Sequence, residues 1–447
     1  MGTTLIILAA GAGTRMASDR PKVLHEVAGA PLLAHALMSG AALNPDHVVV
    51  VTGHGGQAVA ELATRWRPDV ITVEQSERLG TGHAVLQARD ALSEATGDVV
   101  VLYGDTPFIS GSTLTAMRKS RKTHDVVVLG FEARDPARYG RLVTKGDSLE
   151  RIVEWKDATP EERSIKLCNS GIIMADCNQI FDLLDAVGND NAAGEYYLTD
   201  VPAIARDRGL SAGFVTCDEA ETLGINSRAD LAAAEAAFQT RARTAALDAG
   251  VTLTAPETVF FAYDTVLGRD VDIEPNVVFG PGVTVETGAR IRAFSHLEGC
   301  HVSRGASVGP YARLRPGAEL SEGVRVGNFV EIKNATLDEG AKVNHLTYVG
   351  DAHVGKAANL GAGTVTCNYD GVMKHRTDIG DGAFIGSSTM LVAPVRVGNE
   401  AMTASGSVIT SDVEDGALAL GRARQVTKPG LARRLRERLK SIKASKG

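Results

Sequence analysis

Apolar residues recur at every sixth position through much of the second half of the sequence. The ladder comprises Ile273, Phe279, Val285, Ile291 and Leu297 and then, after small shifts of register, Val302, Val308, Leu314, Leu320, Val326, Ile332, Leu337, Val343, Val349, Val354, Leu360, Ile379, Ile385, Leu391 and Val397. This period matches neither an amphipathic helix nor the alternation of a simple strand. It is typical of a hexapeptide β-helix, in which each hexad forms a short strand whose aliphatic side chain points into the coil. One hexad cannot bury that side chain alone, so stacked hexads must form the core.

Glycine follows the ladder residue at several positions, including Gly280, Gly309 and Gly327, where it lets the chain turn a corner without a Cβ clash. This pattern resembles the acyltransferases that build left-handed β-helices and take acetyl groups from acetyl-CoA. The alternative is a prism with a purely structural role, because one fold serves several functions.

Length and composition indicate a soluble protein of more than one domain. A chain of 447 residues exceeds one ordinary core, so we expect two domains. Its 44% hydrophobic and 23% charged residues are ordinary for a globular protein. The net charge of −7 gives no indication of a nucleic-acid partner. The apolar segment 5–10 is too short for a membrane span and follows no basic region, so we interpret it as a buried strand and expect no membrane partner.

The cysteines and the C-terminal charge add two further expectations. The five cysteines contain no C-x-x-C pair, which argues against a disulfide framework or zinc site and favours a reducing, cytoplasmic location. Residues 422–447 include ten Lys or Arg and one acid, Glu437. Such a run is usually a solvated tail. The alternative is attraction of a polyanion such as coenzyme A, for which Arg422 is the best candidate.

The first half alternates apolar runs with helical stretches. Residues 5–8, 48–52 and 99–102 have the pattern of buried parallel strands, and helices are expected over 32–42 and 82–92. This alternation predicts a doubly wound, Rossmann-like α/β domain with ligands at the carboxyl ends of its strands.

A small-residue loop follows the first of these strands. It contains Leu8, Ala9, Ala10, Gly11 and Arg15, with Lys22 close behind. Exposed backbone N–H groups in such a loop can bind phosphate oxygens, and the two cations can neutralise a triphosphate. The loop fits neither the dinucleotide fingerprint nor the Walker A loop. It resembles the sugar-1-phosphate nucleotidylyltransferases.

The third strand ends in Tyr103, Gly104 and Asp105. A carboxylate at such an end can hold Mg²⁺ against nucleotide phosphates, since Mg²⁺ commonly takes only one or two protein ligands there. The alternative role for Asp105 is a helix N-cap. The family resemblance implies that Asp105 shares the metal with Asn226.

Further first-half segments match positions that bind base and sugar in uridylyltransferases. The segment 74–83 contains Gln75, whose amide can both donate to and accept from a pyrimidine edge, and Gly80 and Thr81, where the backbone can approach a ligand closely. The alternative is a polar loop leading into a helix. The resemblance also implies contacts to an N-acetylglucosamine ring from Gly140, Glu154 and Asn169.

The two halves are expected to meet at a helix. Ser227 and Asp230 resemble a capping box, and the Ala-rich stretch 231–249 ends at Gly250. We therefore predict a uridyltransferase domain over 1–226, a linker helix over 227–250, and a left-handed β-helix acetyltransferase domain with a basic tail over 251–447.

Five strings in the second half make the resemblance specific. Residues 313–317, 327–331, 345–348, 359–364 and 366–372, the last of which opens a loop that leaves the coil, look like those of the bifunctional bacterial enzymes that make UDP-N-acetylglucosamine. With the first-half motifs, the resemblance covers nearly the whole chain.

This resemblance implies the roles of the second-half residues. His345 would take the proton from the amine of glucosamine-1-phosphate, a task that suits a histidine. Arg315, Lys333 and Tyr348 would bind the sugar phosphate, with help from Asn359. The residues that would contact acetyl-CoA are Ala362, Asn368, Tyr369, Ser387, Ser405 and Arg422. Cys367 is open to a covalent acetyl-enzyme role, but direct transfer is preferred.

The sequence therefore predicts two consecutive reactions. The second half would acetylate glucosamine-1-phosphate, and the first half would join N-acetylglucosamine-1-phosphate to UMP from UTP with Mg²⁺. The resemblance also implies a homotrimer. Two alternatives remain at this point: the same fold acting on another sugar-1-phosphate, or a non-enzymatic regulatory relative.

Overall fold

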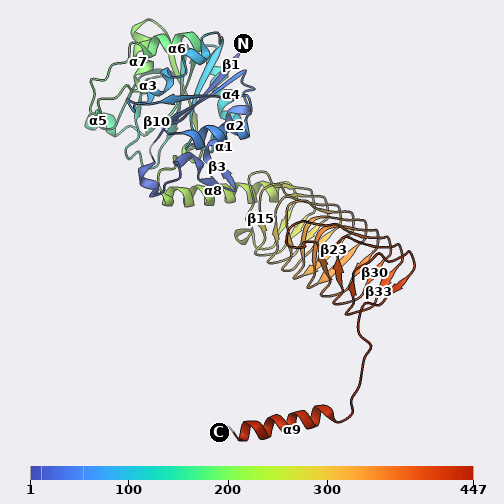
Figure 1. Cartoon of the computed structure of the whole chain (residues 1–447). Helices are drawn as coiled ribbons and strands as arrows, with labels where there is room; N and C mark the ends of the chain where they lie inside the picture. The colour runs from blue at the N-terminus through green and yellow to red at the C-terminus, as the bar shows by residue number, and fades with distance from the viewer. Residues whose placement is uncertain (1, 12, 54, 446–447) are drawn as a thin grey trace. The chain divides into compact units, whose positions relative to one another are not determined.

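The computed structural model of the protein describes residues 2–11, 13–53 and 55–445. The chain forms two compact units, Met1–Ala242 and Arg243–Gly447, and the boundary between them falls within helix α8 (Arg228–Asp248). Figure 1 shows an α/β unit and a coiled unit of short strands.

Unit 1 is built on one mixed sheet with strand order β5-β4-β1-β6-β10-β7-β11-β9-β8. Strand β1 pairs in parallel with both β4 and β6, as the apolar runs predict. The strands are β1 (Thr3–Ala9), β4 (His47–Gly53), β5 (Ile71–Gln75), β6 (Asp98–Tyr103), β7 (Val126–Glu132), β8 (Arg141–Lys145), β9 (Ser148–Val153), β10 (Leu167–Asp176) and β11 (Ala212–Cys217), with a separate hairpin β2 (Glu26–Val27) and β3 (Ala30–Pro31).

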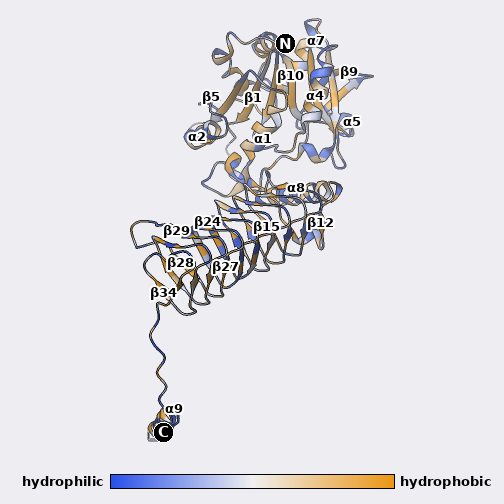
Figure 2. Ribbon diagram, turned by 90° about the vertical axis from the view of Figure 1, so that its right-hand side faces the viewer, coloured by the Kyte–Doolittle hydropathy of each residue, from blue (hydrophilic) through white to orange (hydrophobic). Residues whose placement is uncertain are grey.

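Helices cover both faces of this sheet. They are α1 (Leu32–Ala41), α2 (Gln57–Trp66), α3 (Thr81–Leu86), α4 (Gly111–Ser120), α5 (Pro160–Arg163), α6 (Cys177–Leu184) and α7 (Val201–Asp207), with short 3₁₀ turns η1 (Thr14–Met16), η2 (Lys22–Leu24), η3 (Asp90–Leu92), η4 (Leu198–Asp200) and η5 (Glu219–Thr222). Alternate β1 residues face opposite sides: Leu5 and Ile7 pack in the core that includes α1 and α4, and Ile6 in the core with α3 and α6. Figure 2 shows β1 and β10 as hydrophobic strands at the centre of the unit. The expected doubly wound α/β unit is confirmed.

One predicted helix is shorter than expected. The helix expected over 82–92 ends at Leu86, and η3 forms a separate turn. Ala88 and Leu92 are nonetheless buried. The helical period alone does not distinguish a continuous helix from a helix followed by a turn that buries the same residues.

Helix α8 begins with the expected capping box. The backbone N–H of Ser227 donates to Asp230 Oδ2 at 2.9 Å, and the backbone N–H of Asp230 donates to Ser227 Oγ at 3.2 Å. Both backbone N–H groups lie at the start of a helix, where they would otherwise lack hydrogen-bond partners.

Unit 2 is a left-handed parallel β-helix with three faces. The first face contains β12 (Thr252–Leu253), β14 (Asp272–Ile273), β17 (Arg290–Ile291), β20 (Ser307–Val308), β23 (Arg325–Asn328), β25 (Lys342–His345), β27 (Asn359–Leu360), β30 (Phe384–Ile385), β33 (Met402–Thr403) and β35 (Leu418–Ala419). The second contains β15 (Val278–Phe279), β18 (His296–Leu297), β21 (Arg313–Leu314), β24 (Glu331–Leu337), β26 (Tyr348–Val354), β28 (Val365–Cys367), β31 (Met390–Val392) and β34 (Val408–Ile409). The third contains β13 (Val266–Leu267), β16 (Thr284–Val285), β19 (Cys300–Val302), β22 (Ala318–Leu320), the later parts of β24 and β26, β29 (Thr377–Ile379) and β32 (Val395–Val397); the turn η6 (Pro256–Thr258) lies near the start of the unit.

The hexad ladder forms the core of this coil. Ile273, Leu297, Ile332 and Val349 have no exposed surface, and the other ladder residues are also buried. Strands of successive coils pair in register, for example Ile332 with Val349. The prediction of a hexapeptide β-helix is confirmed.

The corner between the first and second faces, here called the first corner, repeats one backbone conformation. Phe294, Tyr311, Phe329, Leu346 and Ser388 occupy it with positive φ. At the opposite end of the second face, the loop 368–376 leaves the coil after β28 and returns at β29, so Thr366 and Cys367 still belong to the wall.

The chain ends in helix α9 (Leu431–Ala444), whose residues are mostly exposed. Across the described residues, no helix is both long enough and apolar enough to cross a membrane.

Candidate active sites

A cleft of about 270 Å³ opens at the carboxyl ends of β1, β5 and β6 in unit 1. The predicted residues that line it are Leu8, Ala9, Ala10, Gly11, Lys22, Gln75, Gly80, Thr81, Tyr103 and Asp105. Gly104 packs behind them, because its backbone N–H donates to Leu8 O at 2.9 Å. Strand ends of a parallel sheet converge in this way, which explains how loops far apart in the sequence share one cleft.

The ammonium of Lys22 joins the two residues predicted to hold a metal. It donates to the Asp105 carboxylate and to Asn226 Oδ1, the latter at 3.0 Å. Lys22 is only 8% exposed. Gly13 makes room for it, since a Cβ at that position would lie 2.7 Å from Lys22 Cβ. The two side-chain oxygens therefore already converge on one cation, which fits the oxygen ligands that Mg²⁺ takes at nucleotide sites.

Asn226 is positioned by its neighbours at the start of α8. Its backbone N–H donates to Asp230 Oδ2 at 3.0 Å, and the N–H of Ile225 donates to Asp105 O at 3.0 Å. Burial opposes ionisation of Asp230, but hydrogen bonds from Asn226 and Ser227 outweigh it and hold the pKa of Asp230 below its usual value. The capping carboxylate thus fixes the segment that carries Asn226.

The segment predicted to bind the base is tightly held. Gln75 is 4% exposed, and its Nε2 donates to Gly80 O at 3.1 Å. Gly80 has φ +114°, and a Cβ there would lie 2.5 Å from Tyr196 O. Only glycine fits this conformation and this close approach. Thr81 Oγ1 accepts from the N–H of Leu198 at 3.1 Å.

The three residues predicted to contact the sugar lie together. The N–H of Asn169 donates to Gly140 O at 2.9 Å, and a Cβ on Gly140 would lie 3.3 Å from Glu154 Oε1. Thr199 Oγ1 donates to Glu154 at 3.2 Å. Burial raises the pKa of Glu154. The structure therefore brings Gly140, Glu154 and Asn169 into one polar cluster.

One predicted phosphate contact, Arg15, does not line the cleft, and two charged residues that line it were not predicted. Arg15 is exposed on η1 and does not line the cleft. Arg78 and Glu195 do line it. Arg78 lies within the segment 74–83 that was predicted to bind the base. The sequence alone does not distinguish a charged residue that faces a ligand from the other charged residues of a polar loop.

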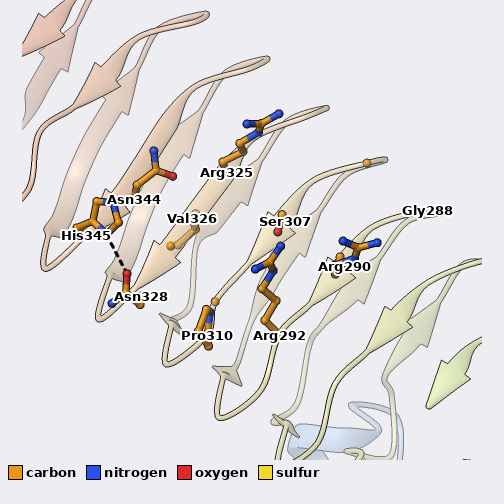
Figure 3. A pocket seen from close by; sticks show the side chains of 13 residues that line it. Gly288, Arg290, Arg292, Ser307, Pro310, Arg325, Val326, Asn328, Asn344 and His345 are labelled. Atoms are coloured by element: carbon orange, nitrogen blue, oxygen red, sulfur yellow. Dashed lines mark hydrogen bonds between the residues drawn. The ribbon is translucent and has the colours of Figure 1, made fainter. Parts of the chain in front are cut away.

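In unit 2, His345 is the last residue of β25. Its Nδ1 lies 2.9 Å from Asn328 Oδ1 on the preceding coil (Figure 3). With Asn328 as acceptor, Nδ1 carries the proton and Nε2 is left free to accept one. Sequence reasoning missed Asn328; the signal is its register, because Asn328 pairs with His345 across the coil.

Four of the six residues predicted to contact acetyl-CoA continue from His345 along the first corner. The N–H of Gly363 donates to His345 O at 3.2 Å, and the N–H of Ser388 donates to Ala362 O at 2.7 Å. On the next coils, the N–H of Gly406 donates to Ser387 O at 2.7 Å, and Arg422 Nη1 donates to Ser405 O at 2.8 Å. His345, Ala362, Ser387, Ser405 and Arg422 thus form one column, here called the corner column.

A second cluster lies on the second face and around the loop 368–376. Arg315 pairs with Glu331 at 2.8 Å, and this carboxylate raises the pKa of Arg315. Lys374 lies beside Lys333 and lowers the pKa of Lys333. We call Arg315, Lys333, Tyr348, Asn368 and Lys374 the second-face cluster.

Hydrogen bonds connect the loop to this cluster. Asn368 Nδ2 lies 3.5 Å from the Tyr348 hydroxyl and also donates to Asp351. Asn334 donates to Asp351 at 2.6 Å. Burial opposes ionisation of Asp351, but these two donors outweigh it and lower the pKa of Asp351. Lys374 was not predicted, because the loop has no hexad register from which its position can be inferred.

Two predicted residues lie apart from their expected groups. Asn359 is on the first face, in register with Lys342, and not with Arg315 and Lys333 on the second face. Tyr369 is 60% exposed, and its hydroxyl donates to Gly371 O within the loop at 2.6 Å. Among the described residues, no hydrogen bond or ion pair joins His345 to the second-face cluster.

Fold and sites together define the class: a nucleotidyltransferase unit followed by a hexapeptide-repeat acyltransferase unit. Residues 5–168 match the family model of the MobA-like NTP transferase domain. Bifunctional protein GlmU of Ruegeria sp. (strain TM1040) is 66% identical over 446 residues, covering 100% of this chain and 99% of that protein. The protein of the same name from Jannaschia sp. (strain CCS1) is 64% identical over 99% of this chain and 97% of its own length. The chain belongs to the family of bifunctional GlmU proteins.

Members of this family are bifunctional enzymes, and this chain is accordingly an acetyltransferase and a uridyltransferase of UDP-N-acetylglucosamine synthesis. Among solved structures, a UDP-glucose pyrophosphorylase complexed with UDP-glucose aligns with a TM-score of 0.45 and 19% identity, covering 54% of this chain and 100% of that chain.

Proposed function

We propose that unit 2 transfers an acetyl group from acetyl-CoA to the amine of glucosamine-1-phosphate, and that unit 1 then transfers UMP from UTP to N-acetylglucosamine-1-phosphate, releasing pyrophosphate. The observation that carries this assignment is the corner column. Four residues assigned to acetyl-CoA follow one another along a single corner, and the column ends at the free Nε2 of His345.

In the acetyl transfer, Nε2 of His345 takes a proton from the ammonium of the sugar, and the resulting amine attacks the thioester carbon. The carbon–nitrogen bond forms and the carbon–sulfur bond breaks. The second proton of the attacking nitrogen passes to the departing sulfur, so that coenzyme A leaves as its thiol. Asn328 holds His345 in the tautomer that can accept the proton. A side-chain amide such as that of Asn368 is a suitable donor to the developing oxyanion.

The second-face cluster supplies the cations for the sugar phosphate. Arg315, Lys333 and Lys374 offer three positive charges, of which Arg315 is paired with Glu331. This cluster and the corner column lie on different parts of one chain. We infer that the complete site forms between two copies, with the cluster of one protomer facing the column of its partner.

A closed ring of three copies satisfies this requirement, because each protomer then gives one surface to each neighbour. Exposed rings on the first corner support such contact. Tyr311 stacks on Phe294 and Phe329 at centroid distances of 4.9 and 5.2 Å, and all three are about half exposed. Apolar surface of this kind is typical of interfaces.

In uridylyl transfer, the backbone of the loop at 8–11 and the ammonium of Lys22 bind the triphosphate of UTP. Asp105 and Asn226 would hold Mg²⁺, and the ion, when bound, supplies charge neutralisation at the reacting phosphates. Gln75 binds the uracil edge, and Gly140, Glu154 and Asn169 hold the sugar so that its phosphate is in line for attack on the α-phosphorus.

The proposed substrates and thiol chemistry agree with a cytoplasmic location. UTP and acetyl-CoA are intracellular metabolites, and the five cysteines, all in the described part of the chain, are free thiols.

The test incubates the full-length protein with glucosamine-1-phosphate, acetyl-CoA, UTP and Mg²⁺ and identifies products by mass. We expect UDP-N-acetylglucosamine, with acetylated sugar phosphate accumulating when UTP is omitted. Light scattering should give the mass of three chains. Failure to acetylate the amine under these conditions would refute the assignment of unit 2, and a monomer with full acetyl transfer would refute the shared site.

A further inference from the structure

Trp155 follows directly after Glu154 in the turn between β9 and α5, and neither proposed reaction gives it a role. It is half-buried. Two guanidinium groups lie against its indole ring, with the Cζ atoms of Arg163 and Arg138 at 4.5 and 5.7 Å from the ring centroid. An arginine at such a distance is attracted to the electron-rich face of the ring. The ring therefore gathers cations from two segments beside a residue assigned to the sugar.

Arg163 holds both the main chain and the ring of Trp155. It is the last residue of α5, and its Nε donates to Trp155 O at 3.3 Å while its guanidinium lies over the indole. A planar guanidinium can stack and donate at the same time, which a lysine ammonium cannot. In turn, Arg163 O accepts from Nη2 of the buried Arg141 at 3.3 Å. The end of α5 is thus fixed to the residue beside Glu154.

Arg138 brings the loop of Gly140 to the same ring. It lies two residues before Gly140 in the chain. A Cβ on Gly140 would lie 3.3 Å from Glu154 Oε1, so this loop and the carboxylate already approach closely. Because Arg138 and Arg163 contact the same ring, Trp155 links the loop of Gly140 with the end of α5.

Within the described part of the chain, no carboxylate holds either arginine in place. Neither Arg138 nor Arg163 has an ion pair there. Glu162, the residue next to Arg163 in α5, pairs instead with Arg151 at 2.6 Å. The position of the two guanidinium groups over Trp155 is therefore not imposed by an acidic partner, and the ring itself accounts for it.

We propose that Trp155 is a positioning residue for the sugar substrate of uridylyl transfer, and that its ring, held by the two guanidinium groups, sets the place of the Glu154 carboxylate. The inference rests on the proposed function, in which Glu154 accepts from sugar hydroxyls. The N–H of Asp157 donates to Glu154 O at 3.0 Å, which closes the turn but does not fix its distance from the loop of Gly140. The contacts of the ring fix that distance, and a substrate contact loses much of its value when the group that makes it is displaced.

The experiment compares Trp155→Leu with Trp155→Phe in the full-length protein, using initial rates of uridylyl transfer at varied N-acetylglucosamine-1-phosphate and UTP. Leucine removes the aromatic face, so the KM for N-acetylglucosamine-1-phosphate should rise about fivefold, the loss expected for an exposed cation–π contact. Phenylalanine keeps a face for the guanidinium groups and should stay within about twofold of the natural protein. The KM for UTP should not change in either variant, which also shows that unit 1 is folded.

Arg163→Gln tests the same contact from its other partner. It removes a guanidinium at an exposed position, where loss of folding is not expected, and should raise the KM for N-acetylglucosamine-1-phosphate about threefold. Arg151→Gln is the matched control, because Arg151 binds α5 through Glu162 and not through the ring. The KM of this control should equal that of the natural protein.

A double-mutant cycle with Glu154→Gln separates positioning from a general structural role. If Trp155 acts through the carboxylate, Trp155→Leu should raise the KM by less than about twofold in the Glu154→Gln background, where the carboxylate is already absent. Residues that act independently would instead give the product of their separate effects.

Four results would overturn the proposal. An unchanged KM in Trp155→Leu would show that the ring has no part in sugar binding. An equal loss in Trp155→Phe would show that the volume of the side chain matters and not its interaction with the arginines. Independent effects of Trp155→Leu and Glu154→Gln would assign Trp155 a structural role only. Absence of uridylyl transfer to N-acetylglucosamine-1-phosphate by the natural protein would refute the proposed function itself, and with it the role of Glu154 on which this inference depends.

Discussion

The ammonium of Lys22 donates a hydrogen bond to the side-chain oxygen of Asn226 at 3.0 Å, although 204 residues separate the two in the chain. The same ammonium binds Asp105. A lysine thus lies between the two oxygens that the proposed function assigns to Mg²⁺. Ammonium and divalent metal therefore compete for one pair of ligands, and Lys22 has to turn toward the phosphates when the metal enters.

This competition predicts the effect of Lys22→Met on metal binding. Removing the ammonium frees Asp105 and Asn226, so the variant should bind Mn²⁺ alone about tenfold more tightly than the natural protein, a difference of about 1.4 kcal/mol. Uridylyl transfer should fall all the same, because the triphosphate loses a cation. Electron paramagnetic resonance titration measures the affinity, and Lys145→Met, at an exposed position on β8, is the control. Equal or weaker Mn²⁺ binding by Lys22→Met would argue against a shared site.

The two reactions should respond independently to substitution. Asp105→Ala removes a proposed metal ligand and should reduce uridylyl transfer by roughly a thousandfold while acetyl transfer continues. His345→Ala removes the proposed base and should reduce acetyl transfer by about a hundredfold or more while uridylyl transfer continues. Separate assays with N-acetylglucosamine-1-phosphate and with glucosamine-1-phosphate measure each step. Loss of both activities in one well-folded variant would refute two independent sites.

Asn328 is expected to act through the orientation of His345. Asn328→Ala removes the acceptor of the 2.9 Å hydrogen bond at Nδ1, so both tautomers become populated and kcat for acetyl transfer should fall roughly tenfold. Asn328→Asp restores an acceptor and should recover most of the activity, with the acidic limb of the pH profile shifted upward because a carboxylate stabilises the protonated imidazole. A purely structural role would give no such shift, and unchanged kcat in Asn328→Ala would contradict the assignment.

Asn328 also shows what the sequence can and cannot predict. The ladder through Ile332 and Val349 is a local period, so it predicts the β-helix directly. Contacts between coils depend on a register of 17 or 18 residues, and Asn328 is 17 residues from His345. Counting hexads in threes assigns each residue to a face. By that count Asn359 belongs with Lys342 and not with Arg315, a separation that motif matching alone does not give.

In unit 1, what the sequence fails to predict is the direction of exposed side chains. The strand-end loops with Gly80 and Asp105 were predictable, because small or acidic residues after buried strands mark ligand sites. The position of Arg15 was not, since a short 3₁₀ turn decides which way an exposed side chain points. Lys374 lies in an irregular loop, where neither period nor pairing fixes its neighbours.

Glu154 predicts a pH dependence of sugar binding. Burial raises its pKa above the ordinary value of 4.5. As the pH falls toward this raised pKa, Glu154 gains a proton and becomes a weaker acceptor for sugar hydroxyls, so the KM for N-acetylglucosamine-1-phosphate should rise. Glu154→Gln should raise KM about tenfold at neutral pH and make it independent of pH in that range. A KM profile that is the same in the natural protein and in Glu154→Gln would refute this role.

The raised pKa of Glu154 also makes the stability of the folded protein depend on pH. The folded protein binds the proton of Glu154 more tightly than the unfolded chain does. The protonated group therefore stabilises the fold at low pH, and this contribution is lost as the pH rises through the raised pKa. Glu154→Gln should therefore raise the thermal unfolding temperature at neutral pH and not near pH 4. Unfolding followed by calorimetry at both pH values checks the sign.

Gly350 should be required for acetyl transfer but not for folding. A Cβ at this position would lie 2.3 Å from the Tyr348 hydroxyl and 2.9 Å from Asn368 Nδ2, so Gly350→Ala must displace two members of the second-face cluster. Both atoms are at the ends of side chains, which can move at little cost, and stability should change by less than about 1 kcal/mol. Displacement of about 1 Å at a reacting site costs up to a hundredfold in rate. We expect acetyl transfer to fall at least tenfold, with uridylyl transfer unchanged.

Gly340→Ala is the matched control, since a Cβ there meets open space. Its φ of +70° favours glycine, so we expect this control to lose a modest amount of stability. Full acetyl transfer in Gly350→Ala would show that Tyr348 and Asn368 do not hold substrate in the geometry described.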